Sequence, residues 1–434
     1  MDRHPVGGRN ASARPERRQS TSRVLTPEPT HPTERLGPYA LAMTYPDPLL
    51  TARDLRSEIL ALRGATDSDR RVPEGLATHL GQAGFGRLLL PAEQPGHQLD
   101  PLAWLDVLEE FADAEAAVAW LAWNSALPCL VARHLTAEGR ADVFADPAAM
   151  YANSTRPSGR AVRTDGGFML SGRWSLVSGC ELAAWMPLMA LVWDPDSGRP
   201  EKTDAGPALR LCFLPSDQIE IIDTWHSGGL RGSGSHDVTV SDRFVPDHFV
   251  ADLAAPNTMR DQPLGRMPWA ALLAAGHASI SLGIVRAVDR TFREEIAGAG
   301  SVDTGTTDKR THPGLQATYA DGVELVHAAR SHLRSVTGRL WAQATAERAM
   351  TPLDIADLFA AARHAGQAAK VAAVQLFELA GTAALYESSP IERAMRDLQT
   401  VNQHVIVSTV VAEQVGRVRL GLDPTMPFFF PGDA

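Results

Sequence analysis

The sequence predicts an α+β protein in which a small block of β-strands separates two helical blocks. Apolar residues recur at helical spacing in the first third of the chain, short apolar runs punctuated by Gly, Pro and Asp follow, and long helical periodicities then return. We expect a disordered tail over residues 1–42, a helical domain over 43–148, a β domain over 149–258 and a helical bundle over 259–434.

The tail and the first helices are read from composition and capping signals. Residues 1–42 are rich in Arg, Pro, Ser and Thr, so they bury too little apolar surface to offset the entropy of ordering. Asp100-Pro101 gives an N-cap followed by proline at the first helical position. The nearly all-apolar run over 114–135 predicts one buried helix.

Strands and later helices follow in order. Gly166-Gly167 predicts the turn of a hairpin, after which strands are expected over 185–193, 208–214, 219–222 and 238–245. Helices are expected over 280–296, 314–346, 352–379 and 390–420. Gly381 is a helix C-cap signal, and Ser389-Pro390 opens the last helix.

Composition excludes several classes of partner. The 434 residues carry a formal net charge of −10 and no basic stripe, so nucleic acid is not an expected partner. The three cysteines lie far apart with no CxxC pair, which indicates neither a disulfide framework nor a metal site and fits the cytoplasm. The apolar run Trp269–Gly276 is too short to span a bilayer, so no membrane is expected.

The Gly-rich segment and an adjacent triplet do not predict familiar sites. Residues 228–234 contain no complete G-x-G-x-x-G and lead into a strand, so they lack the context of a dinucleotide-binding turn. Ser235, His236 and Asp237 are neighbours in that strand and cannot form a hydrolase triad.

Three strings in order carry a family resemblance: Gly172–Cys180, Asp223–Pro246 and Arg396-Asp397 through His404. With the order of blocks, they resemble the acyl-CoA dehydrogenase superfamily, most closely its group D two-component flavin-dependent monooxygenases, over about residues 50–424. The resemblance implies an acyl-CoA dehydrogenase-like fold with a central β-barrel or sandwich domain and a C-terminal four-helix bundle.

Residues near the flavin are implied by the same resemblance. Ser178 would contact flavin N5, and Trp174 would pack against the ring; a simple turn and simple core filling are the alternatives. Asn153 and Ser154 would line the pyrimidine edge, where an Asx-type turn is the alternative. Asn124, an amide inside an apolar helix, either bonds between helices or lines the substrate cavity.

Assembly and phosphate binding are also implied. Family members are dimers of dimers, and Gly381-Thr382 lies near the segment that contacts a neighbouring subunit's flavin, so we expect a homotetramer. The family's Arg-x-x-Phe-Gly phosphate string is absent near 290–301. Lys309 or Arg310 is a possible substitute, and the choice between FMN and FAD stays open.

His404 is the expected catalytic acid or base, together with Ser178. On pattern alone, Arg393, Asp397, Thr400 and His404 share one face of the last helix, as on a solvated surface. The resemblance instead implies that His404 lies beside the flavin, where many acyl-CoA dehydrogenases carry a glutamate. An imidazole of ordinary pKa serves as acid or base near neutral pH.

The expected function is therefore the oxygenase component of a two-component monooxygenase. Reduced FMN or FAD from a separate NAD(P)H:flavin reductase would react with O2 through a C4a-hydroperoxyflavin and hydroxylate a small substrate, which we expect to be aromatic. An acyl-CoA dehydrogenase with a relocated base and a degenerate flavin-binding scaffold subunit are the alternatives.

Overall fold

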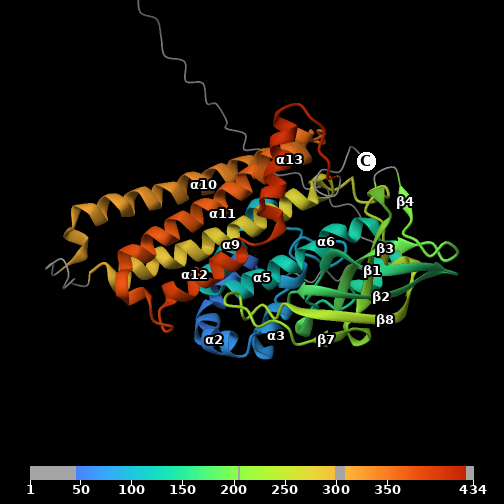
Figure 1. The fold of residues 1–434 in the computed structure, drawn as a ribbon, viewed down its shortest axis with the longest axis horizontal. Coiled ribbons are helices and arrows are strands. Elements are labelled where there is room, and N and C mark those ends of the chain that lie inside the picture. The colour runs from blue at the N-terminus through green and yellow to red at the C-terminus, as the bar shows by residue number, and fades with distance from the viewer. Residues whose placement is uncertain (1–44, 204–205, 299–307, 427–434) are drawn as a thin grey trace, which may run out of the picture. The chain divides into compact units, whose positions relative to one another are not determined.

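The computed structural model describes residues 45–203, 206–298 and 308–426, and the expected tail over 1–42 lies outside them. Within them the chain runs from helices to strands and back to helices, as Figure 1 shows. The predicted α+β class is confirmed.

Seven α-helices in the described residues precede the sheet: α1 Pro48–Asp54, α2 Arg56–Ser68, α3 Glu74–Gln82, α4 Pro101–Ala114, α5 Ala116–Asn124, α6 Ala126–Val131 and α7 Ala137–Val143. Helix α4 begins as predicted, because the Asp100 carboxylate accepts hydrogen bonds from the N–H groups of Leu102 and Ala103. The single helix predicted over 114–135 is wrong: Ser125 divides it into α5 and α6. Its start is separated from α4 by an extended backbone at Glu115 (φ −158°, ψ 116°). The Glu115 carboxylate caps α5 there by accepting from the Ala117 N–H.

The β block holds one seven-stranded mixed sheet and one two-stranded sheet within the described residues. The strands of the large sheet are β1 Ser154–Thr164, β2 Gly167–Val177, β3 Trp185–Trp193, β6 Leu209–Pro215, β7 Glu220–Ile222, β8 His236–Pro246 and β9 Val250–Ala251. Its order is β7-β8-β2-β1-β3-β6-β9, and only β1 and β3 pair in parallel. The small sheet pairs β4 Lys202–Thr203 with β5 Gly206–Pro207. The predicted hairpin is β1–β2, turning at Gly166 with φ +74°.

The C-terminal helices are α8 Pro263–Arg266, α9 Trp269–Thr291, α10 Pro313–Thr345, α11 Pro352–Ala380, α12 Pro390–Val401 and α13 Thr409–Arg419. Helices α9, α10 and α11 lie side by side in Figure 1, and α12 and α5 also contact α9. Buried apolar residues from both helical blocks form one continuous core, and the sheet has a second core. Helix α9 therefore contacts helices of both helical blocks, including α5 and α12, which border the site described below.

The single helix predicted over 390–420 is wrong: α12 ends at Val401 and α13 begins at Thr409. The Asn402 side chain folds back to donate to the Leu398 carbonyl and to Ser281. His404 then adopts an extended conformation (φ −66°, ψ 139°) and caps a 3₁₀ turn over Val405–Val407. His404 consequently lies in a connection between helices and not on a helix face.

One helical segment in the described part of the chain, Trp269–Ile296, has the length and mean hydropathy (1.5) of a membrane span. The expectation that this apolar run is too short was wrong, because Gly276 does not end the helix. A Cβ at Gly276 would lie 2.2 Å from the Trp104 ring, so the glycine permits close packing of α9 on α4. Of the segment's most apolar window, 89% is buried within the protein, which is the burial of a core helix.

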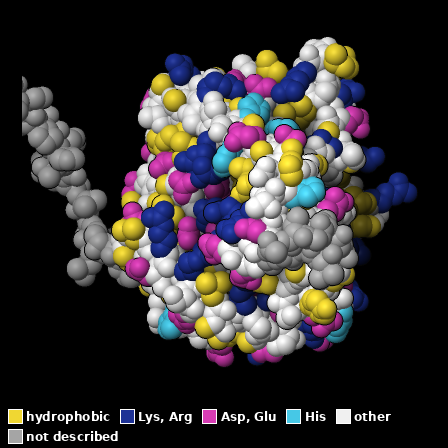
Figure 2. All heavy atoms as spheres, turned by 90° about the vertical axis from the view of Figure 1, so that its left-hand side faces the viewer, with side chains coloured by type: hydrophobic (Ala, Val, Ile, Leu, Met, Phe, Trp, Pro, Cys, Tyr) yellow, Lys and Arg dark blue, Asp and Glu magenta, His cyan; other side chains and the backbone are white. Residues whose placement is uncertain are grey.

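Charges are mixed on the face of the molecule that Figure 2 shows. Lys and Arg side chains are interspersed there with Asp and Glu side chains, and no basic patch covers that face. This distribution agrees with the net charge of −10 and gives a polyanion no continuous surface on that side.

Candidate active site

His404 presents one ring nitrogen as a free donor. Its Nδ1 atom accepts a hydrogen bond from the Ile406 N–H at 3.3 Å. A neutral imidazole carries a single ring proton, so the acceptor role of Nδ1 places that proton on Nε2. Among the described residues Nε2 has no hydrogen-bond partner, so His404 can donate to a bound molecule.

Four rings from three segments meet at His404, and we call them the aromatic cluster: Trp120 and Trp123 of α5, His277 of α9, and His404. The centroid of the His404 ring lies 5.8 Å from Trp120, 5.2 Å from Trp123 and 5.5 Å from His277. His277 in turn lies 5.6 Å and 5.7 Å from the two indoles, which it meets edge-on. Edge-to-face contacts of this kind are the geometry that aromatic rings prefer.

Both histidines of the aromatic cluster are neutral at physiological pH. Burial, followed by His277 and Arg156, lowers the pKa of the half-buried His404 to about 3. Burial likewise lowers the pKa of the fully buried His277 to about 4, although the Val401 carbonyl acts in the opposite direction. The near-neutral pKa expected for His404 from sequence therefore does not apply.

Ser178 is joined to the aromatic cluster through an indole. Its side chain is 5% exposed, and its Oγ atom accepts a hydrogen bond from the Trp120 Nε1–H at 2.9 Å. The same Oγ lies 2.7 Å from Ser235 Oγ, which lies 2.6 Å from Ser233 Oγ. Because each hydroxyl group can rotate, this row of three serine hydroxyls lets Ser178 act as a hydrogen-bond donor or as an acceptor.

Leu176 has a backbone conformation that the sequence did not indicate. It has φ +62° and a 48% exposed side chain, two residues before Ser178, where the pairing of β2 with β8 shifts between Trp174 and Val177. A bulge re-aims a side chain, and a strained apolar residue held in solvent is typical of a binding site. The sequence analysis included this position in the string Gly172–Cys180 but did not single out Leu176.

Trp174 lies in the core of the sheet. It is fully buried, its Nε1 donates to the Met189 carbonyl at 2.7 Å, and its ring fills the space that Gly159 and Gly172 leave open. This position supports the core-filling alternative, and a contact with flavin stays a prediction.

The two asparagines expected near the flavin and substrate lie together. Asn124 Nδ2 donates to the Trp120 carbonyl at 2.8 Å, and Asn153 Nδ2 donates to the Asn124 carbonyl at 2.8 Å. Ser154 is buried, and its Oγ accepts from the Arg156 N–H at 3.4 Å. The start of β1 is thereby tied to the helix that carries both indoles.

Gly381 and Thr382 lie apart from the aromatic cluster, with no hydrogen bond or ring contact to it within the described residues. Both are exposed at the end of α11, and Gly381 has φ +65°. Lys309 lies beside them, because its Nζ donates to the Ala380 carbonyl at 3.0 Å. Arg310 is instead occupied by Asp308, which it contacts at 2.6 Å.

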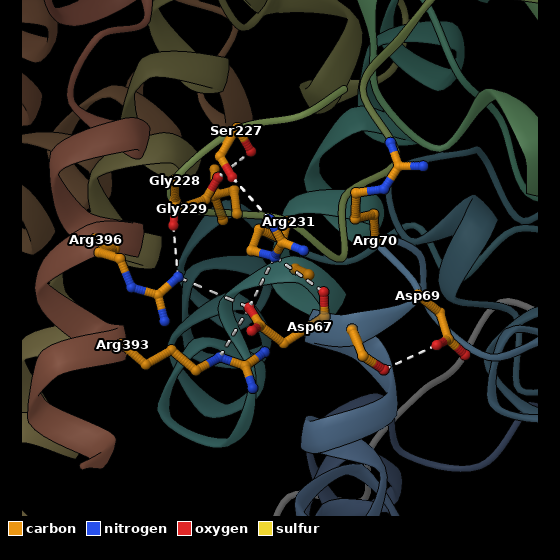
Figure 3. A network of polar contacts seen from close by, with 12 residues as sticks. Asp67, Asp69, Arg70, Ser227, Gly228, Gly229, Arg231, Arg393 and Arg396 are labelled. Carbon is orange, nitrogen blue, oxygen red and sulfur yellow. Dashed lines mark hydrogen bonds and ion pairs between the residues drawn. The ribbon is translucent and has the colours of Figure 1, made fainter. Parts of the chain in front are cut away.

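Figure 3 shows the polar network that joins α12 to Asp67 of α2 and to the Gly-rich loop. The guanidinium groups of Arg231, Arg393 and Arg396 lie 3.7–4.0 Å from Asp67. Arg393 also donates to the buried Glu115 carboxylate at 2.8 Å. Since Glu115 caps α5, this contact holds α12, the helix that precedes His404, against α5, the helix that carries Trp120 and Trp123.

The aspartate of the predicted Arg-Asp pair, Asp397, is buried. Asp397 accepts from the Leu230 N–H at 2.7 Å, and burial, followed by Glu115, raises the pKa of its carboxyl to about 7. A solvated polar face, the alternative reading of this segment, is therefore wrong for Asp397.

The adjacent Ser235, His236 and Asp237 face different partners. His236 Nδ1 accepts from the N–H groups of Thr224 and Trp225, whereas Asp237 pairs with Arg173 at 2.8 Å. The Gly-rich loop packs against α12, where a Cβ at Gly229 would lie 2.1 Å from the Arg396 carbonyl oxygen. Neither segment has the geometry of a triad or of a nucleotide-binding turn.

Comparison with known proteins agrees with this geometry. Residues 275–409 match the family described as the acyl-CoA dehydrogenase C-terminal domain. The chain is 29% identical over 378 residues to the oxygenase component of an FADH2-dependent resorcinol hydroxylase from Rhizobium sp. (83% of this chain, 90% of that protein). It is 25% identical over 367 residues to an indole-3-acetate monooxygenase from Acinetobacter baumannii (84% and 91%).

Solved structures give the same fold. XiaF from Streptomyces sp., solved in complex with FADH2 and glycerol, matches with a TM-score of 0.80 and 24% identity, over 87% of this chain and 96% of that chain. The acyl-CoA dehydrogenase-like fold predicted from sequence is confirmed. The resemblance to flavin-dependent monooxygenases is borne out as a similarity to these proteins.

Proposed function

We propose that this chain, a homologue of flavin-dependent monooxygenases built on the acyl-CoA dehydrogenase fold, is the oxygenase component of a two-component system. It hydroxylates a small aromatic substrate with O2 and reduced FMN or FAD, which a separate NAD(P)H:flavin reductase supplies. The observation that carries the proposal is Trp120, whose ring belongs to the aromatic cluster while its Nε1–H binds Ser178. Trp120 thus links the aromatic cluster, where we place the substrate, to Ser178, where the resemblance implies the flavin.

Residues around His404 fit a reduced flavin. Leu176, two residues before Ser178, offers an exposed apolar side chain, and His404 Nε2–H offers a donor. The Arg156 side chain has no partner within the described residues and adds positive charge near His404, which suits an electron-rich ring. When bound, reduced flavin reacts with O2 and supplies the oxygen atom for hydroxylation.

The chain's own groups bind, orient and exclude water. Trp120 and Trp123 bind the substrate ring edge-to-face and shield it from solvent. His404 stays neutral and donates a hydrogen bond from Nε2, while Ser178 accepts or donates through the hydroxyl chain. Because α5 is capped by Glu115 and Glu115 is held by Arg393, the indoles and His404 keep a fixed separation.

The arrangement gives no support to an acyl-CoA dehydrogenase. That reaction needs a carboxylate near the flavin to remove a proton, but Glu392 is paired with Arg396 at 2.8 Å. Burial, His277 and Arg156 account for the pKa shift of His404, and no carboxylate is among these causes. A monooxygenase needs no such base.

We extend the proposal to a cytoplasmic homotetramer, a dimer of dimers. Leu385 and Tyr386, which follow Gly381 and Thr382, are 62% and 68% exposed, as expected of side chains that a neighbouring subunit covers. Lys309 beside this segment is the candidate phosphate contact for FMN or FAD.

A reductase-coupled assay tests the proposal. The purified chain is supplied with NADH, a separate flavin reductase, FMN or FAD, and a panel of phenols and indoles under ¹⁸O2. We expect a hydroxylated product that carries the label. Failure of every reduced flavin to support product formation would refute the proposal, and reduction of bound flavin by an acyl-CoA would identify a dehydrogenase instead.

A further inference from the structure

His277 is a buried histidine whose second ring nitrogen has no partner. It lies in the middle of α9 and is fully buried. Its Nε2 atom lies 2.9 Å from the Val401 carbonyl oxygen. A carbonyl oxygen only accepts, so Nε2 carries the proton and donates.

The Nδ1 atom of His277 is therefore an unprotonated acceptor. It is buried without a hydrogen-bond partner among the described residues. A buried polar atom normally has a partner, and one that lacks it is typical of a site that a ligand completes. The His277 ring touches the other three members of the aromatic cluster, so a ligand bound among these rings is the natural source of a donor.

The two histidines of the aromatic cluster have opposite capacities. His404 offers a donor at Nε2, because its Nδ1 is occupied by the Ile406 N–H. His277 offers an acceptor at Nδ1, because its Nε2 is occupied by the Val401 carbonyl. Both assignments follow from fixed backbone groups, so neither ring can exchange its tautomer without losing a hydrogen bond.

We propose that His277 is a specificity-determining residue whose Nδ1 accepts a hydrogen bond from an O–H or N–H group on the aromatic substrate. The inference rests on the proposed function and narrows it. The substrate class is a phenol or an indole-type heterocycle that carries its own donor. An aromatic ring without a donor leaves the acceptor unpaired and binds less tightly.

Matched ligand pairs measure this preference. The anaerobic complex of the protein with reduced FAD is titrated by calorimetry with phenol against anisole and with indole against 1-methylindole. We expect the member with the donor to bind about tenfold more tightly, the scale of one buried hydrogen bond. In His277→Phe, which keeps an aromatic ring, the two members of each pair should bind equally.

Controls separate a binding role from a structural one. His332 is exposed on α10, so His332→Phe should keep the wild-type preference. In His277→Gln the amide can donate to Val401 while its oxygen still accepts, so part of the preference should return. Equal binding by the wild type, a preference that survives in His277→Phe, or no binding of either donor-bearing probe would each overturn the inference.

A second measurement does not depend on any variant folding. In wild-type protein with ¹⁵N-labelled histidine, phenol should shift the His277 Nδ1 resonance, and anisole should not. An unchanged resonance with phenol bound would also overturn the inference. The proposed function fails on different grounds, namely if no labelled product forms with any reduced flavin; hydroxylation without the donor preference would refute only the role of His277.

Discussion

Burial makes the two histidines of the aromatic cluster neutral, and this changes what His404 can contribute. The sequence predicted both His404 and Ser178 as site residues, which stays a prediction. It did not reveal the depressed pKa of His404, because the causes are burial and His277 on a helix more than a hundred residues away. Nor did any local pattern mark Leu176, whose positive φ depends on the bulge between β2 and β8.

At the residue scale, His404→Ala should uncouple oxygen use from hydroxylation. The Nε2–H donor is lost, whereas the contacts of Ser178 and Leu176 are not, so flavin should still bind. Product formation should fall by about 10²–10³-fold, the usual scale for removing one hydrogen-bond donor that stabilises developing charge. Hydrogen peroxide release should rise in step with the loss of product. The surface variant His332→Ala serves as the control, and normal coupling in His404→Ala would contradict the assignment.

The depressed pKa of His404 also predicts how stability depends on pH. The folded protein keeps His404 neutral down to about pH 3, whereas the unfolded chain takes up the proton near its ordinary pKa of 6.5. Unfolding therefore binds a proton below pH 6.5, and the free energy of unfolding falls as pH drops through this range. His404→Gln should remove up to about one bound proton from that linkage.

Denaturant titrations of both proteins between pH 7 and pH 4.5 would measure this difference. Comparing the two proteins cancels groups with other shifts, such as Asp397, whose pKa is raised to about 7. Identical pH slopes for the wild type and His404→Gln would show that the imidazole is solvated.

Leu176→Gly separates backbone strain from flavin binding. Glycine adopts positive φ without the cost of about 1–3 kcal/mol that other residues incur, so the apoprotein should be as stable as wild type or more stable. The exposed apolar side chain two residues before Ser178 is lost, so the dissociation constant for flavin should rise. Thermal unfolding and fluorescence titration with FAD test the two effects. Unaltered flavin affinity would remove Leu176 from the site.

At the scale of elements, the sequence predicted where helices begin better than where they break. The caps at Asp100 and Ser389-Pro390 are local, and the structure has helices at both places. The breaks at Glu115 and His404 occur inside apolar or periodic runs, because tertiary partners hold the backbone there: Arg393 for Glu115 and Ser281 for the adjacent Asn402. Both breaks border the aromatic cluster, where tertiary contacts override the local helix propensity of the sequence.

The ion pair between Arg393 and Glu115 should hold α12 against α5. Both side chains are largely buried, 12% and 2% exposed. Arg393→Met therefore leaves Glu115 only its longer contact with Arg63 at 3.6 Å and removes the ion pair of Asp397. The free energy of unfolding should fall by about 3–5 kcal/mol, the range for breaking a buried pair. Urea titration measures it, with Arg419→Met as the control. Arg419 pairs with Asp357 at the surface, where the loss should be about 1 kcal/mol or less.

At the scale of the whole molecule, the block order and the fold were predictable because periodicity and turn residues repeat over long stretches. Packing between blocks was not: one hydrophobic core runs through both helical blocks, and α9 at its centre is longer than the apolar run suggested. The site arises from that packing, because α5, α9, the turn that follows β2 and the α12–α13 connection each supply residues. The sequence of any one of these segments therefore cannot reveal the site.

The chain by itself should not oxidise NADH or NADPH appreciably. Its Gly-rich loop lacks the dinucleotide fingerprint, and contact with α12 leaves no room for a pyrophosphate, since even a Cβ at Gly229 would collide with the Arg396 carbonyl. Electrons must then arrive on flavin that another protein has reduced. Absorbance at 340 nm should stay constant when the protein, FAD and NADH are mixed in air, and oxygen uptake should begin only when a flavin reductase is added. A matched sample with reductase but without this chain gives the background from free reduced flavin. Rapid NADH oxidation by the isolated chain would show a nicotinamide site that the described fold does not provide.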